Sequence, residues 1–110
     1  MSKDLNMTLL LDFYGDTLSE KQREAMELFY NGDYSLSEIA EETGITRQGV
    51  RDRIVKGEEI ITSLEEKLGL AARFGDVSSM VDFIVSRLTA LKEQGIEVDD
   101  IIDAAKRLDS

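Results

Sequence analysis

Residues 35–57 read Ser35-Leu-Ser-Glu-Ile-Ala-Glu-Glu-Thr-Gly-Ile-Thr-Arg-Gln-Gly-Val-Arg-Asp-Arg-Ile-Val-Lys-Gly57. Ser35 and Glu38 have the spacing of a capping box, in which each side chain pairs with the other residue's backbone N–H at a helix start. Gly44 stands where a left-handed residue ends a helix, and Thr46 can cap a second helix soon after. The stretch therefore predicts a helix-turn-helix, whose second helix typically enters the major groove of DNA.

Apolar residues at helical spacing support both helices of this motif. Leu36, Ile39 and Ala40 predict the inner face of the first helix, and Val50 and Ile54 that of the second. The second stripe continues beyond the motif, through Ile61, Leu64 and Leu68. We therefore expect one long helix over about residues 47–68. Gly57 lies on the same stripe and predicts the close approach of another helix.

Two further helices are expected before the motif. The first should end near Gly15, with an inner face formed by Leu5, Leu9, Leu10 and Phe13. A second capping box, Ser19 with Gln22, starts the next helix. Its apolar stripe consists of Ala25, Met26, Leu28 and Phe29. The aromatic residues Phe13, Tyr14, Phe29 and Tyr30 are expected in the core.

A C-terminal helical hairpin is expected after a boundary at residues 70–76. Its first helix should end near Gly95, with an inner face made by Val77, Met80, Val81, Ile84, Leu88 and Leu91. Its second helix should turn Ile101, Ile102, Ala105 and Leu108 inward. We therefore divide the chain into a helix-turn-helix DNA-binding domain, residues 1–70, and a C-terminal extension, residues 71–110, for packing or dimerisation.

The composition favours an all-α protein. The 110 residues are 42% apolar, enough for a core, and include no proline and no cysteine. No apolar run approaches the roughly 20 residues of a membrane span, and the N-terminus lacks the apolar core of a signal peptide. A cytoplasmic protein is expected.

The net charge of −10 is unusual for a protein that binds DNA, because phosphate neutralisation supplies much of the affinity. Its distribution is uneven, however. Residues 44–57 carry the cations Arg47, Arg51, Arg53 and Lys56 against Asp52 alone. The basic cluster thus coincides with the predicted recognition helix, on an otherwise acidic protein.

The helical period of 100° per residue turns one set of side chains away from Val50 and Ile54. Gln48 could pair with an adenine edge and Arg51 with guanine, while Thr46, Arg47 and the helix amides suit a phosphate. Arg53 and Lys56 would position the protein on the backbone. The complete predicted DNA-binding set is Thr46, Arg47, Gln48, Arg51, Asp52, Arg53, Val55 and Lys56. Asp52 is unfavourable there unless it meets a cytosine amino group or neutralises Arg51.

The motif resembles domain four of bacterial sigma factors, and a longer set of segments resembles the YlxM family of small helix-turn-helix proteins. The segments are 12–14, 18–22, 28–30, 33–42, 46–48, Asp52-x-Ile54 and 65–69. The resemblance covers about residues 5–70, whereas residues 71–110 share only helical character with the family. Three recognition-helix residues depart from the family pattern: Gly49 replaces a common alanine, Arg51 an aromatic residue and Arg53 an asparagine.

The resemblance implies an all-α, sigma-like DNA-binding module that is dimeric and acts as a regulator. It also implies an accessory link to the signal recognition particle, since family genes typically lie beside those of the particle. A homodimer would supply the second half-site of a two-fold DNA target.

Catalysis and cofactor binding are not expected. The chain has no histidine, no cysteine and no glycine-rich loop followed by lysine, so the usual parts for general base catalysis, thiol catalysis and phosphate binding are missing. Asp99, Asp100 and Asp103 fit a helix start better than a metal site.

Two alternatives to DNA binding remain open, so that three possible functions are considered in all. The acidic surface could serve a protein-binding adaptor that keeps the helix-turn-helix fold and binds the signal recognition particle protein or the transcription machinery. A third possibility, implied only by the resemblance, is binding to the particle's structured RNA.

Overall fold

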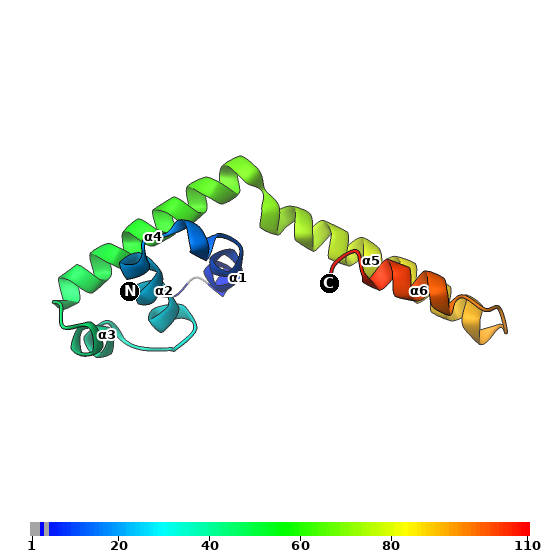
Figure 1. Cartoon of the computed structure of the whole chain (residues 1–110), viewed down its shortest axis with the longest axis horizontal. Coiled ribbons are helices and arrows are strands. Elements are labelled where there is room, and N and C mark those ends of the chain that lie inside the picture. Colours follow the sequence, from blue (N-terminus) through cyan, green and yellow to red (C-terminus); the bar gives the residue numbers. More distant parts are fainter. Residues whose placement is uncertain (1–2, 4) are drawn as a thin grey trace. The chain divides into compact units, whose positions relative to one another are not determined.

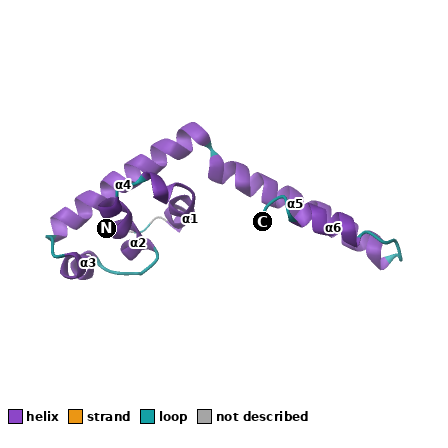
Figure 2. Cartoon of the chain, in the orientation of Figure 1, coloured by secondary structure: helices purple, strands orange, loops and turns teal. Residues whose placement is uncertain are grey.

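The computed structural model describes residues 3 and 5–110 as α-helices joined by short turns, with no strand in that part of the chain (Figures 1 and 2). The all-α prediction is confirmed. The chain divides into two compact units, residues 1–69 and residues 70–110, which are described separately. None of the described helices is both long and apolar enough to cross a membrane.

The first unit contains four α-helices and one short 3-10 turn. They are α1 (Leu5–Tyr14), the 3-10 turn η1 (Gly15–Thr17), α2 (Glu20–Tyr30), α3 (Leu36–Thr43) and α4 (Arg47–Leu68). Both predicted capping boxes are present. Ser19 pairs with Gln22 at the start of α2, and Ser35 pairs with Glu38 at the start of α3.

The corner of the helix-turn-helix has the predicted geometry. Gly44 ends α3 in the left-handed region, with φ of 74°, and its N–H donates to the carbonyl of Ala40. Thr46 then caps α4, because its hydroxyl accepts a hydrogen bond of 3.0 Å from the N–H of Gly49. These two residues fix where α4 begins.

Helix α4 is the central element of this unit and packs against α1, α2 and α3. Val50, Ile54 and Ile61 are completely buried along its inner face. Gly57 lies on the same face, and a Cβ there would come within 3.0 Å of Met26 Cγ on α2. The close approach predicted at Gly57 is therefore confirmed, with α2 as the neighbour.

The inner face of α1 differs from the prediction. Met7, Leu11 and Tyr14 are buried, whereas Leu9 is 44% exposed. Leu10 and Phe13 pack partly against the core, and the side chain of Leu5 lies outside the described residues. Three consecutive leucines, at 9–11, let the apolar period be placed in more than one phase. Contact with α4 selects the phase that buries Leu11.

The second unit is a hairpin of α5 (Leu70–Glu93) and α6 (Asp99–Lys106). The first helix of the hairpin was expected from about Val77, after a boundary at residues 70–76, but α5 begins earlier, at Leu70, directly after Gly69. Gly69 ends α4 with φ of 62°. Gly75 and Asp76, typical turn residues, lie within α5.

The core of the hairpin is small. Val81 is the best-buried residue on α5, and Val98, Ile102 and Ala105 are the buried residues on the α6 side. Five residues that were expected to face inward are instead exposed, by 39–65%: Met80, Ile84, Leu91, Ile101 and Leu108. Their exposure corrects the sequence-based assignment of the hairpin core.

Candidate nucleic-acid interface

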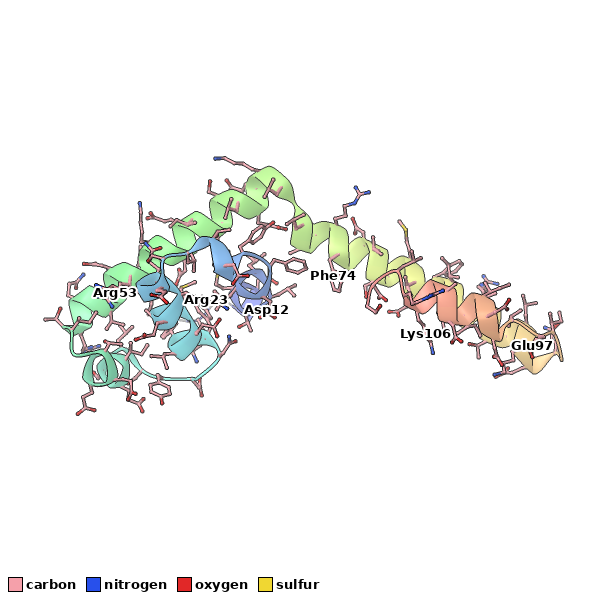
Figure 3. All side chains as sticks on the ribbon, in the orientation of Figure 1. Asp12, Arg23, Arg53, Phe74, Glu97 and Lys106 are labelled. Atoms are coloured by element: carbon pink, nitrogen blue, oxygen red, sulfur yellow. The ribbon has the colours of Figure 1, made fainter. Side chains whose placement is uncertain are left out.

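The first turns of α4 present the predicted side chains to solvent. Gln48 and Arg51 are exposed, whereas Val50 and Ile54 in the same turns are buried. Of the remaining predicted residues, Thr46, Arg47, Asp52 and Lys56 are exposed, and Arg53 and Val55 are half-buried. These side chains are therefore not covered by the acidic helices of their own unit. Figure 3 shows Arg53 on α4 and Arg23 on α2.

The arginines of this surface are not engaged within the described part of the chain. The guanidinium groups of Arg47, Arg51 and Arg53 form no hydrogen bond or ion pair with the residues that the structure describes. Arg23, by contrast, is held by Asp16, with 2.6 Å between Nη1 and the carboxylate. Guanidinium groups without an internal partner retain all their donors for an external acceptor.

Asp52 contacts a different neighbour from the one expected. Its carboxylate accepts a hydrogen bond of 2.9 Å from the side-chain amide of Gln48, one helical turn earlier. It does not neutralise Arg51, the pairing considered from the sequence. A base that binds Gln48 must therefore either replace this hydrogen bond or use the amide oxygen and the second N–H of Gln48.

A hollow lies where α3 and α4 begin, lined by Leu36, Arg47, Gln48 and Arg51. Its wall combines one apolar side chain, two cations and one amide. The N-terminal amides of α4 lie in the same turn and carry the positive end of the helix dipole. Such a combination suits an anionic group such as a phosphate.

The electrostatic character of α4 changes after Gly57. A second hollow on the helix is lined by Val55, Glu58, Glu59, Thr62, Ser63 and Glu66. Lys56 is at the transition, with its ammonium group 3.8 Å from Glu59. The positive surface is thus confined to about the first three turns of the helix.

Acidic groups also border the positive surface on α3. The backbone N–H and the hydroxyl of Ser35 both hydrogen-bond Glu38 in the capping box, and they hold the pKa of Glu38 below its ordinary value. Glu38 therefore stays ionised at neutral pH. This fixed negative charge on the first motif helix confines the positive surface from that side.

Two hydrogen bonds from tyrosines hold α4 to α1 and α2, and neither was predicted from the sequence. Tyr14 on α1 donates to Glu65 at 2.6 Å, and Tyr30 on α2 donates to Glu58 at 2.9 Å. The two glutamates are seven residues apart, so they lie on one side of α4. This seven-residue spacing is the feature of the sequence from which a shared role of the two glutamates could have been predicted. The aromatic rings themselves are in the core, as predicted.

No metal site accompanies these features in the described part of the chain. The aspartate and glutamate residues there do not form a group of three or more able to hold an ion. Asp99 and Asp100 are in the first turn of α6, where the backbone N–H of Ile101 donates to the Asp100 carboxylate.

Comparison with known proteins identifies relatives along nearly the whole chain. Residues 1–101 match a family described as "Putative helix-turn-helix protein, YlxM / p13 like". A UPF0122 protein of Thermoanaerobacter sp. strain X514 is 44% identical over 90 residues, 82% of this chain and 77% of the relative. UPF0122 proteins of Listeria innocua and Bacillus cereus AH187 are 36% and 35% identical, covering 97% and 99% of both chains.

These matches extend the resemblance found in the sequence. It was placed at residues 5–70, but the family match continues to residue 101 and includes α5 and the first turn of α6. The statement that residues 71–110 share only helical character with the family is therefore wrong. The family match therefore includes α5 as well as the helix-turn-helix.

Proposed function

Because the chain belongs to the YlxM/p13-like family of helix-turn-helix proteins, we propose that it binds duplex DNA and acts as a sigma-like regulator. The observation that carries this proposal is the coincidence of the chain's basic cluster with the exposed first turns of α4. A protein with net charge −10 has few other surfaces that could approach a phosphate backbone.

In the proposed complex, the first turns of α4 enter the major groove. Gln48 pairs with an adenine edge and Arg51 with guanine O6 and N7. Thr46, Arg47 and the α4 amides bind a phosphate, beside the hollow at the start of the helix. The residues at the border of the contact surface are Asp52, Arg53, Val55 and Lys56.

The test is a binding titration against genomic fragments at several salt concentrations. Arg51→Ala should weaken specific binding by about 1–3 kcal/mol, because a bidentate base contact is lost. Gln48→Ala should have a similar effect. Lys67→Ala is the matched control, since Lys67 is an exposed cation in the last turn of the same helix. The logarithm of the affinity should fall linearly with the logarithm of the salt concentration. Absent or salt-independent binding would contradict the proposal.

The proposed function has further parts. We infer that the protein acts in the cytoplasm as a homodimer, without enzymatic activity or a cofactor. An accessory role in the signal recognition particle pathway remains part of the proposal.

One observation favours a second function, that of a protein-binding adaptor. The second hollow on α4, with Glu58, Glu59 and Glu66, would attract a basic protein surface. The signal recognition particle protein is one candidate for this partner. The particle's RNA is negatively charged, so it would instead bind the positive first turns of α4. A pull-down before and after nuclease treatment separates these cases. Recovery of one stoichiometric protein after nuclease treatment would favour the adaptor, and competition between duplex DNA and folded RNA would distinguish the two nucleic acids.

A further inference from the structure

The two-helix hairpin has one polar face and one apolar face. On the polar face, Thr89 and Lys92 of α5 share a hollow with Asp99, Asp103 and Lys106 of α6. Lys92 and Asp99 are 2.7 Å apart and connect the two helices. Lys106 is shown on α6 in Figure 3. This face has the side chains of an ordinary solvated surface.

The apolar face lies on the opposite side of both helices. Advancing 100° per residue from Val81, which is buried between the helices, places Met80, Ile84 and Leu91 on the side away from Thr89 and Lys92. The same construction from Ile102 places Ile101 on that side of α6, and the exposed Leu108 follows in the turn after the helix. These five residues form what we term the hairpin apolar face, and they are exposed by 39–65%.

The hairpin cannot bury these side chains by itself. In residues 70–110 the least exposed side chains, those of Val81 and Val98, are still 4% exposed, whereas five side chains of the first unit are completely buried. Domains near or below about 40 residues usually need oligomerisation, metals or disulfides to be stable. The chain has no cysteine. Two helices alone leave half of an expected bundle core uncovered.

The charge of the hairpin apolar face favours contact with an identical face. Along α5 and α6, helical periodicity places two charged residues there, both arginines: Arg73, and Arg87, whose guanidinium group lies 5.2 Å from the ring centroid of Phe83. No carboxylate of α5 or α6 lies among the apolar side chains of the face, and Asp76 lies at its edge. Most other surfaces of a chain with net charge −10 would bring carboxylates against carboxylates in a symmetric contact.

We propose that the hairpin apolar face binds the same face of a second copy of this chain, so that two hairpins form a four-helix bundle. The bundle buries Met80, Ile84 and Leu91 against their counterparts, and Ile101 of α6 and Leu108 in the turn after it extend the contact. A two-fold axis makes such an interface self-complementary. This inference names the surface for the homodimer of the proposed function, but it requires no DNA.

The test is the mass of the full-length chain in solution, measured by sedimentation equilibrium without DNA. The wild-type chain should be a dimer at micromolar concentration, and Ile84→Glu should lower its mass roughly twofold because a buried charge has no partner in the interface. Met80→Gln is a milder variant, which should weaken association while circular dichroism shows unchanged helix content. Thr89→Glu is the matched control, an added carboxylate on the polar face, and should remain dimeric.

Salt separates this inference from DNA binding. Added salt screens the repulsion between two acidic chains, so dimerisation should be unchanged or tighter, whereas DNA binding should weaken. Arg51→Ala should reduce DNA binding and leave the mass unchanged. A monomeric wild-type chain would overturn the inference, and so would a dimer that persists in both Ile84→Glu and Met80→Gln.

Discussion

The two units of this chain use apolar residues in opposite ways. In residues 1–69, α4 is covered by α1, α2 and α3, and its inner residues Val50, Ile54 and Ile61 are completely buried. In residues 70–110, α5 meets only α6 within its unit, and large apolar side chains remain in solvent. The first unit has a well-buried core and exposes a charged face of α4. The second unit buries little of its apolar surface and exposes an apolar helix face.

The largest expected effect is on the free energy of unfolding, compared between one alanine substitution in each unit. Ile54→Ala should lower the free energy of unfolding of the first unit by about 2–5 kcal/mol, because a completely buried side chain leaves a cavity. In the background of Ile84→Glu, where the chain is expected to be monomeric, Ile101→Ala should cost less than about 1 kcal/mol, since Ile101 is half exposed. Urea titration followed by circular dichroism measures both. Equal losses would show that the two cores do not differ as described.

An intermediate effect compares one glycine from each unit. Gly44→Ala should destabilise the helix-turn-helix by about 1–2 kcal/mol, because an alanine at φ of 74° strains the backbone. Gly75→Ala should stabilise the hairpin by up to about 1 kcal/mol, because Gly75 is within α5 and an added Cβ would meet nothing within 4 Å. Thermal unfolding should therefore shift in opposite directions. The same sign for both variants would contradict the geometry at one of them.

The smallest effect is the pH dependence of the hairpin. A hydrogen bond from Lys92 lowers the pKa of Asp99 below its ordinary value, and the same pair raises the pKa of Lys92. The stabilisation from Asp99 is therefore present above the ordinary aspartate pKa, about 4, and is lost as the pH falls through the lowered value. That from Lys92 is present below the ordinary lysine pKa and is lost as the pH rises through the raised value.

The measurement for this pair is an NMR titration of the Asp99 carboxyl group. Its midpoint should lie below that of an unpaired aspartate and should move up toward it in Lys92→Met. Glu38 is the comparison in the first unit, because Ser35 lowers its pKa without any cation. The Glu38 midpoint should not respond to Lys92→Met. A shift of both midpoints would show that the Asp99 effect does not come from the Lys92 contact.

The parts of the fold that could be predicted are those set by local chemistry. Ser35, Gly44 and Thr46 each act on their own turn of backbone, so the ends of α3 and the start of α4 followed from residue type alone. Gly57 could be assigned to a helix contact because it interrupts an apolar stripe. Such signals do not depend on what the distant parts of the chain do.

The errors arose where distant packing or side-chain geometry decides. Leu9 and Leu11 are equally apolar, and only contact with the rest of the unit determines which is buried. Gly75 and Asp76 favour a turn locally, but they are helical within a long α5. At the candidate site, the exposure of Gln48 follows from periodicity, whereas its hydrogen bond to Asp52 depends on the rotamers of both side chains.

The tyrosines give the first unit an optical signal of its own. The chain has no tryptophan, and its three tyrosines, Tyr14, Tyr30 and Tyr34, all precede Gly69. Tyr14 and Tyr30 donate to carboxylates in the folded state, a contact that quenches phenol emission. Tyrosine emission should therefore increase when the helix-turn-helix unfolds and should not change when the hairpin unfolds. Emission and ellipticity, measured together on one unlabelled sample, would then resolve two unfolding transitions.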